Sequence, residues 1–199
     1  MKETILCGVA INDANYSVSK WVDGKNVWYC PYYLKWSNMI KRCYSKTQKT
    51  YSPSYEKSYV CEEWLRFSNF KRWVDSQPNK DWINCEPDKD ILSLGESCYS
   101  PKTVVFVSTV VNNFINDSKP SKSVRLTGAT PVGNKFLSQC SHPIERYPSG
   151  KSKNIYLGLF DTEQEAHSAW KAKKHELACQ LADMQKDLRV AKALRERYK

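Results

Sequence analysis

The sequence predicts an α+β protein of two domains, and three observations carry the prediction. Residues 88–114 contain a short strand, a loop, a second strand and a capped helix in close succession. A polar, proline-containing linker follows at 118–123. Beyond it lie three short extended segments and one long helical pattern. Because domain boundaries fall in linkers of this kind, we expect one domain over 1–117 and a second over 124–199.

The first part of the chain is predicted to form a hairpin and two helices. Asp23-Gly24 is a turn signal between extended segments at 18–22 and 26–30. Helical spacing then gives the segment 32–44 one apolar face, made of Trp36, Met39, Ile40 and Cys43. A second helix repeats this pattern with Trp64, Phe67, Phe70 and Val74. We expect both faces to be buried in a core.

The next segment has strand and helix signals at short intervals. An apolar pair at 91–92 predicts a first strand, and the β-branched run 103–107 predicts a second. Ser108 then has the side chain of a helix cap. The segment is therefore expected to form a ββα unit.

Oxygen-bearing side chains occur at both ends of this unit. Asp88 and Asp90 are two residues apart, so on an extended chain they project from the same side. The helix carries Asn112 and Asn113, and a helix packed across the hairpin would bring an amide towards the carboxylates. Such oxygen ligands suit a hard cation such as Mg²⁺ better than Zn²⁺. The sequence therefore predicts a divalent metal site here.

Together with four blocks ahead of it, this unit resembles the ββα-metal core of HNH nucleases, in the form common among bacteriophage HNH homing endonucleases. The blocks that resemble the usual lead-in are 8–13, 36–44, 60–64 and 67–73. These separated blocks agree in order and spacing. The resemblance implies an HNH-like nuclease domain that hydrolyses phosphodiester bonds of duplex DNA with Mg²⁺ or Mn²⁺.

The resemblance also implies roles for the run Asp88-Lys89-Asp90. It implies metal ligation by Asp88, Asp90 and the amide of Asn112 or Asn113, and it makes all three residues of the run catalytic, with Lys89 steadying phosphate charge. HNH nucleases usually carry a histidine at the end of the first strand, whereas this chain has Lys89-Asp90 there and no histidine in the first domain. Either Asp90 acts as the general base, or the metal ion activates the water.

The missing histidine leaves a second function open. The chain is then a nuclease-derived protein that has lost catalysis and binds DNA, or that binds a host protein and inhibits it. A third alternative is RNA binding or cleavage, because a basic, aromatic-rich surface does not distinguish RNA from DNA. Stabilisation by magnesium distinguishes the first function from the second.

Composition favours an anionic partner. The formal net charge is +10 over 199 residues, and such a surface attracts nucleic-acid phosphates. The seven tryptophans favour packed cores over disorder. The N-terminus has no apolar run of signal-peptide length, and no stretch approaches the length of a membrane span. With the resemblance, this predicts a virus-encoded, non-secreted protein of the host cell cytoplasm that has no membrane partner.

Eight cysteines are spread along the chain without a C-x-x-C pair. Most lie in apolar or aromatic surroundings, such as Arg42-Cys43-Tyr44. Structural zinc usually recruits closely spaced pairs, and cytosolic proteins usually keep their thiols reduced. We therefore expect the cysteines to act as small buried hydrophobic side chains, and we expect no structural zinc. A zinc site assembled from scattered cysteines is the alternative.

The second domain has a signature of its own. Thr162 and Glu165 have the spacing of a capping box ahead of a long helix. Three strands, this helix and the run YLGLFDTEQEA resemble the plant ethylene-responsive-factor (APETALA-type) DNA-binding domain over about 124–180. The resemblance implies a sheet laid in the major groove, with contacts from Arg125, Lys135, Gln139, Lys151, Lys153 and Tyr156. Because Leu137 stands where a basic reader is common, we expect phosphate contacts rather than sequence reading.

The C-terminal tail continues the helical pattern past Leu177. Its apolar residues keep roughly coiled-coil spacing, and lysines and arginines lie outside them. Packing back on its own chain is the first expectation, and dimerisation or a DNA contact are the alternatives. The sequence is therefore compatible with a monomer or a homodimer.

Overall fold

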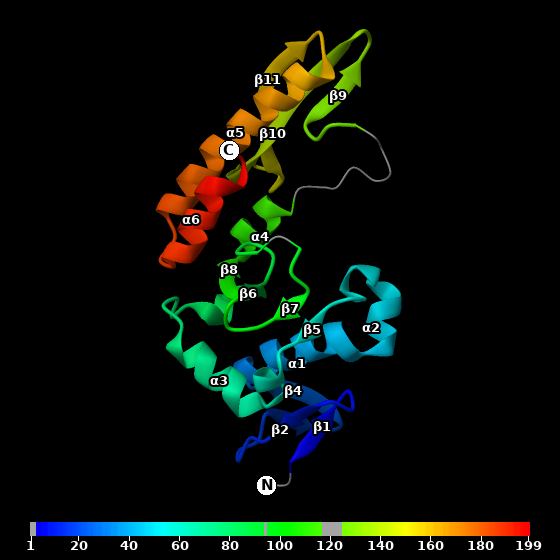
Figure 1. The fold of residues 1–199 in the computed structure, drawn as a ribbon, viewed down its shortest axis with the longest axis vertical. Coiled ribbons are helices and arrows are strands. Elements are labelled where there is room, and N and C mark those ends of the chain that lie inside the picture. Colours follow the sequence, from blue (N-terminus) through cyan, green and yellow to red (C-terminus); the bar gives the residue numbers. More distant parts are fainter. Residues whose placement is uncertain (1–2, 94, 117–124) are drawn as a thin grey trace. The chain divides into compact units, whose positions relative to one another are not determined.

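A computed structural model describes residues 3–93, 95–116 and 125–199, and it confirms the α+β class (Figure 1). The chain divides into two compact units, Met1–Phe106 and Val107–Lys199. This division falls ahead of the expected boundary at residue 117, and the expected linker at 118–123 lies outside the described residues. The short helix that follows residue 107 therefore belongs with the second unit.

The first unit combines small sheets with helices. In chain order the elements are β1 (Thr4–Leu6), β2 (Ala10–Asn12), β3 (Ser19–Val22), β4 (Lys25–Tyr29), α1 (Pro31–Tyr44), α2 (Lys46–Tyr51), η1 (Pro53–Tyr55), β5 (Tyr59–Val60), η2 (Glu62–Leu65), α3 (Phe67–Ser76), η3 (Trp82–Asn84), β6 (Cys85–Asp88), β7 (Cys98–Tyr99) and β8 (Val105–Ser108). The strands pair two by two: β1 with β2, β3 with β4, β5 with β7, and β6 with β8. The boundary between the two units falls inside β8.

The predicted hairpin is confirmed as the antiparallel pair β3–β4. Asp23 and Gly24 both have positive φ, 50° and 73°, as a tight hairpin turn between right-twisted strands requires. Trp21 and Trp28 on this hairpin are 61% and 47% exposed. The hairpin therefore adds little to the core of the first unit.

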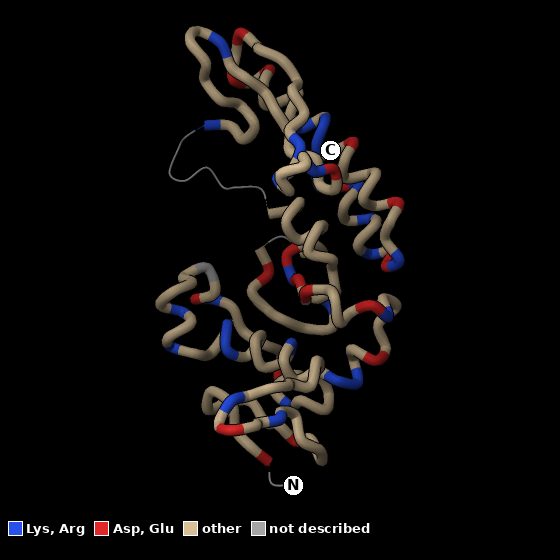
Figure 2. The backbone as a smooth tube through the Cα atoms, turned by 180° about the vertical axis from the view of Figure 1, so that it is seen from behind, with Lys and Arg blue, Asp and Glu red and all other residues tan. Residues whose placement is uncertain are grey.

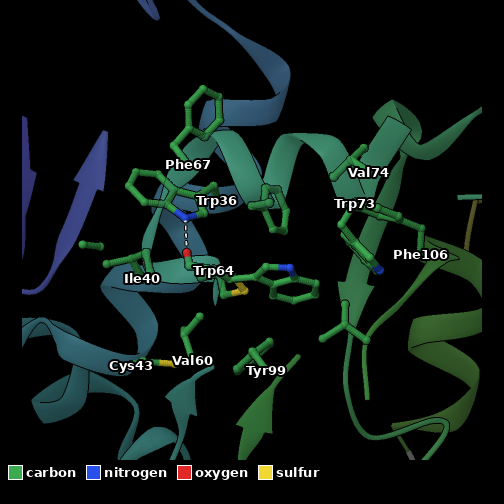
Figure 3. Close-up of a cluster of buried hydrophobic side chains, with 14 of the residues drawn as sticks. Trp36, Ile40, Cys43, Val60, Trp64, Phe67, Trp73, Val74, Tyr99 and Phe106 are labelled. Carbon is green, nitrogen blue, oxygen red and sulfur yellow. Dashed lines mark hydrogen bonds between the residues drawn. The ribbon is translucent and has the colours of Figure 1, made fainter. Parts of the chain in front are cut away.

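The predicted buried faces of the two helices meet in one aromatic core (Figure 3). Trp36 of α1 donates its indole N–H to the backbone oxygen of Trp64 at 2.7 Å. The Trp64 and Trp73 ring centroids lie 4.5 Å apart, and Phe106 of β8 lies 5.4 Å from Trp73. Trp64 belongs to the 3₁₀ turn η2 rather than to α3, so the second predicted helix begins later than expected. This core ties α1, α3 and β8 together.

Helix α3 receives its N-terminal cap from a distant residue. Its own N-cap, Arg66, makes no side-chain cap hydrogen bond. Instead the Asp13 carboxylate accepts from the Ser68 backbone N–H at 2.9 Å and from the Ser68 hydroxyl at 2.7 Å. Burial raises the pKa of Asp13, but these hydrogen bonds outweigh it and leave the pKa below its usual value. The N-terminal segment is thereby fixed to α3.

Replacing Asp13 by alanine is expected to lower the free energy of unfolding by about 1–2 kcal/mol at neutral pH, because α3 loses its cap. The lowered pKa means that this stabilisation is present above the unfolded-state pKa of about 3.9 and is lost as the pH falls through the folded-state value. Urea unfolding at several pH values measures it. Asp13→Asn, which keeps one acceptor oxygen, should lose less. Equal stability of parent and alanine variant at neutral pH would refute the capping role.

The second unit is a three-stranded antiparallel sheet with helices. Its elements are α4 (Thr109–Ile115), β9 (Ala129–Val132), β10 (Lys135–Arg146), β11 (Ser152–Phe160), α5 (Glu163–Asp183) and α6 (Leu188–Arg197). The strand order in the sheet is β11-β10-β9. Three strands followed by a helix were expected, but β9 begins later than predicted and β10 and β11 are longer. The capping box of α5 is confirmed, since Thr162 and Glu165 exchange side-chain-to-backbone hydrogen bonds of 3.1 and 3.2 Å.

The C-terminal tail folds back on its own unit. Helix α5 ends at Asp183, and Asp187 caps the separate helix α6. Leu194 on α6 is fully buried. On α5 the Lys174 ammonium donates to the Phe114 backbone oxygen of α4 at 2.7 Å. This bond, together with ring contacts between Phe114 and Tyr198, is the physical reason that α4 belongs to the second unit.

Candidate functional site

Strand β6 ends at Asp88, and the chain turns immediately afterwards. Asp88 Oδ1 accepts from the backbone N–H groups of Asp90 at 2.9 Å and Ile91 at 2.8 Å. The strand expected at 91–92 is therefore wrong, because an aspartate side chain that bonds the backbone two residues on favours a turn. The prediction that Asp88 and Asp90 project from one side of an extended strand is wrong for the same reason. Both carboxylates nevertheless belong to one tight turn.

Lys89 lies inside this turn. Its side chain is 11% exposed, and its ammonium donates to Asp90 Oδ1 at 2.6 Å and to the Glu96 backbone oxygen at 2.8 Å. The Asp90 side chain remains 53% exposed. The lysine therefore holds the Asp90 carboxylate against the loop while part of that carboxylate faces solvent.

The two asparagines lie on α4. Ser108 caps this helix as predicted, accepting from the Val111 backbone N–H at 3.2 Å. Asn112 Oδ1 accepts from the Asn116 side chain at 3.3 Å, and Asn113 lines a pocket of the second unit. The four expected metal ligands are thus divided between the two units. Within the described ranges, no group of three or more Asp, Glu, His and Cys side chains is gathered as a metal site.

The cysteines are all free thiols, and most are buried or half-buried. Burial raises the pKa of Cys43 to about 12, and it also raises the pKa values of Cys61 and Cys85. Thiols with raised pKa values stay protonated, whereas zinc binds the thiolate. These three cysteines therefore behave as small hydrophobic side chains.

The sheet of the second unit has one covered and one open face. Ser138 and Cys140 are buried, and the Ser138 hydroxyl donates to the Ala166 backbone oxygen of α5 at 2.7 Å. Because side chains alternate along a strand, Gln139 lies on the opposite face, paired in register with Tyr156. Tyr156 is 66% exposed. Two of the expected DNA-contacting residues thus lie side by side on the open face.

The basic residues that are expected to contact DNA differ in whether an acidic side chain already pairs with them. Lys135 pairs with Asp161 at 2.9 Å, and Lys153 pairs with Glu145 at 2.8 Å. The hydrogen bond from Lys153 lowers the pKa of Glu145. Arg125 and Lys151 are exposed. A phosphate approaching the two paired lysines must compete with carboxylates that already hold them.

Comparisons with protein-family models, with curated proteins and with solved structures found no match. Lysine and arginine alternate with aspartate and glutamate along both units rather than forming one block of a single sign (Figure 2). None of the helices in the described ranges is both long and apolar enough to cross a membrane.

A polar pocket of about 540 Å³ in the second unit was not predicted. Its lining includes four residues that carry carboxamides, Asn113, Asn116, Gln139 and Asn154, together with Trp170 and Lys174. These residues come from α4, from the chain just after it, from two strands and from α5, so no sequence motif joins them. The sequence contains one indication of this pocket: Lys174 falls on the otherwise apolar buried stripe of α5.

Proposed function

We propose that this protein is a metal-dependent DNA endonuclease, in which the turn Asp88-Lys89-Asp90 serves cleavage and the second unit holds duplex DNA. The observation that carries the proposal is this acidic turn. It directly follows β6, β6 pairs with β8, and the Ser108-capped helix α4 follows β8. Apart from the two-residue strand β7, which lies between the turn and β8, this order of strand, acidic turn, strand and helix is the arrangement that the resemblance to HNH nucleases implies.

The donor chemistry of the turn fits a hard divalent cation. Mg²⁺ is commonly bound through one or two carboxylates, with water and substrate phosphate completing the shell. Asp88 and Asp90 supply two carboxylates, and the Asp90 side chain is about half exposed. A bound Mg²⁺ or Mn²⁺ would supply Lewis-acid activation of water and would neutralise phosphate charge. The asparagines of α4 are not needed in this ligand set.

The chain's own residues have distinct parts in the proposal. Asp88 holds the turn closed through its two backbone hydrogen bonds, which fixes where Asp90 lies. Lys89 holds the Asp90 carboxylate, and because its side chain is only 11% exposed, its positive charge would act on a bound phosphate from within the turn rather than by direct contact. The turn therefore presents the Asp90 carboxylate with a positive charge close behind it.

DNA binding by the second unit has separate support. The chain carries a formal net charge of +10. The sheet has an open face with exposed Tyr156 and Gln139, while α5 covers the other face. Phosphate attraction holds a duplex regardless of its sequence, and a polar, aromatic sheet face suits contact with a groove.

A labelled linear duplex, incubated with the purified protein and analysed on a denaturing gel, tests the proposal. We expect shortened strands in Mg²⁺ or Mn²⁺ and none with excess chelator. A gel shift at moderate salt, run on the same duplex, reports binding separately. Intact strands in every metal would reject the endonuclease.

A second function is favoured by one observation, the ion pair that occupies Asp90. If Lys89 holds this carboxylate permanently, the turn is structural, and the protein binds DNA or inhibits a host protein without cutting. Intact strands with a clear gel shift would support DNA binding without cleavage. Intact strands without a shift would point to a protein partner.

A further inference from the structure

The polar pocket of the second unit is built almost entirely from neutral hydrogen-bonding groups. Four of the residues that line it carry a carboxamide, namely Asn113, Asn116, Gln139 and Asn154. Threonine and serine hydroxyls add to them, and the described residues that line it include no carboxylate. A carboxamide has both a donor and an acceptor. Two of these side chains are already partly engaged, because Asn154 Oδ1 accepts from the Ser141 hydroxyl at 2.8 Å and the Asn116 amide donates to Asn112 Oδ1 at 3.3 Å. Such a lining suits a neutral ligand with several donors and acceptors along its edge.

An aromatic wall and a buried cation close the pocket. Trp170 is 8% exposed, and its ring lies against Gly128, where an added Cβ would stand 2.1 Å from the ring. Lys174 is 7% exposed and donates to the Phe114 backbone oxygen. These contacts fix the wall before any ligand enters. A preformed pocket of about 540 Å³ falls within the range of ligand sites.

Part of the pocket lining lies on the open face of the sheet. The pairing of β9 with β10 runs from Lys135 to Ser138, and the next residue of β10, Gln139, lines the pocket. Gln139 is also the register partner of exposed Tyr156. A duplex held on this face would therefore lie next to Gln139 of the pocket lining.

We propose that this pocket receives a single nucleobase turned out of duplex DNA held on the sheet. A base is flat and neutral and has donors and acceptors along one edge, which matches a lining of carboxamide residues, and the indole of Trp170 borders the same space. The proposal rests on the proposed function, since it needs duplex DNA on the second unit. The second unit then recognises a base that leaves its stack easily.

Binding of matched and mispaired duplexes tests the pocket. A mispaired base costs less to extrude than a paired one. We expect the parent protein to bind a duplex with one central mispair about tenfold or more tightly than the matched duplex, measured by fluorescence anisotropy. The double substitution Gln139→Ala/Asn154→Ala should bring this ratio close to one. Gln164→Ala removes an exposed carboxamide of α5 outside the pocket and should keep the parent's ratio.

A second readout separates base capture from mere flexibility of mispaired DNA. The base analogue 2-aminopurine, placed in the mispair, should change its emission when the parent binds and should not when the double variant binds. Duplex binding with a ratio near one and unchanged emission would overturn the pocket and leave the proposed function standing. Absence of binding to either duplex would overturn the DNA-holding role of the second unit, and the pocket with it.

Discussion

Replacing Asp90 by alanine is expected to slow cleavage of a labelled duplex by at least about a hundredfold, while duplex binding stays nearly unchanged. The Asp90 side chain is 53% exposed, and in the proposed function its carboxylate binds the metal ion. Removing a direct metal ligand should cost no less activity than removing a group that only supports a ligand. Gel analysis of strand cleavage and a gel shift on the same duplex measure the two effects.

The alanine variant needs a structural control, because it also removes the ion-pair partner of Lys89. Asp90→Asn keeps an oxygen that can accept from Lys89 and removes only the negative charge. We expect it to retain the parent's thermal stability and to cleave as poorly as the alanine variant. Glu62→Ala, which removes an exposed carboxylate of η2, should cleave like the parent. Parent-like cleavage by Asp90→Asn would reject the assignment of Asp90.

Replacing Gly128 by alanine is expected to destabilise the second unit by about 3 kcal/mol or more. Gly128 has φ of +81°, and an added Cβ would lie 2.1 Å from Trp170 Cγ, well inside van der Waals contact. Left-handed backbone costs a non-glycine residue roughly 1–2 kcal/mol, and overpacking adds about 1–3 kcal/mol. Trp170 cannot retreat easily, because its ring also contacts His167 and Tyr198.

Gly133 supplies a matched control for this prediction. Its φ is +61°, but an added Cβ there meets nothing within 4 Å. Gly133→Ala should therefore lose only the backbone contribution, roughly 1–2 kcal/mol. Urea unfolding followed by tryptophan fluorescence compares the variants. If both variants lose equal stability, the close packing of Gly128 on Trp170 is refuted.

The elements that sequence reasoning predicted well are those whose signals are local. The Ser108 cap and the Thr162–Glu165 capping box each depend on residues within one helical turn, and both are present. The apolar face of α1 is equally local, because helical spacing alone gathers its buried side chains. The hairpin turn at Asp23-Gly24 follows from backbone conformations that few residues adopt.

The acidic turn was mispredicted because two local preferences compete there. The apolar pair after Asp90 indicates a strand, but the Asp88 carboxylate accepts hydrogen bonds from the backbone N–H groups of Asp90 and Ile91 and forms a turn.

The place where the two units divide depends on contacts that are distant in sequence. Lys174 and Tyr198 bind α4 to the second unit, and no pattern near residue 107 indicates this. The pocket was missed for the same reason.

Relaxation of supercoiled plasmid by the parent and by the Asp88→Ala/Asp90→Ala double variant, run in parallel, measures whether the acidic turn cleaves DNA. A single nick relaxes a plasmid, so this assay detects cleavage of either strand. We expect relaxation by the parent in Mg²⁺ or Mn²⁺, none with excess chelator, and none by the double variant. Equal relaxation by parent and double variant would contradict the acidic turn as the cleavage site, and a plasmid left supercoiled by the parent in both metals would contradict the endonuclease itself.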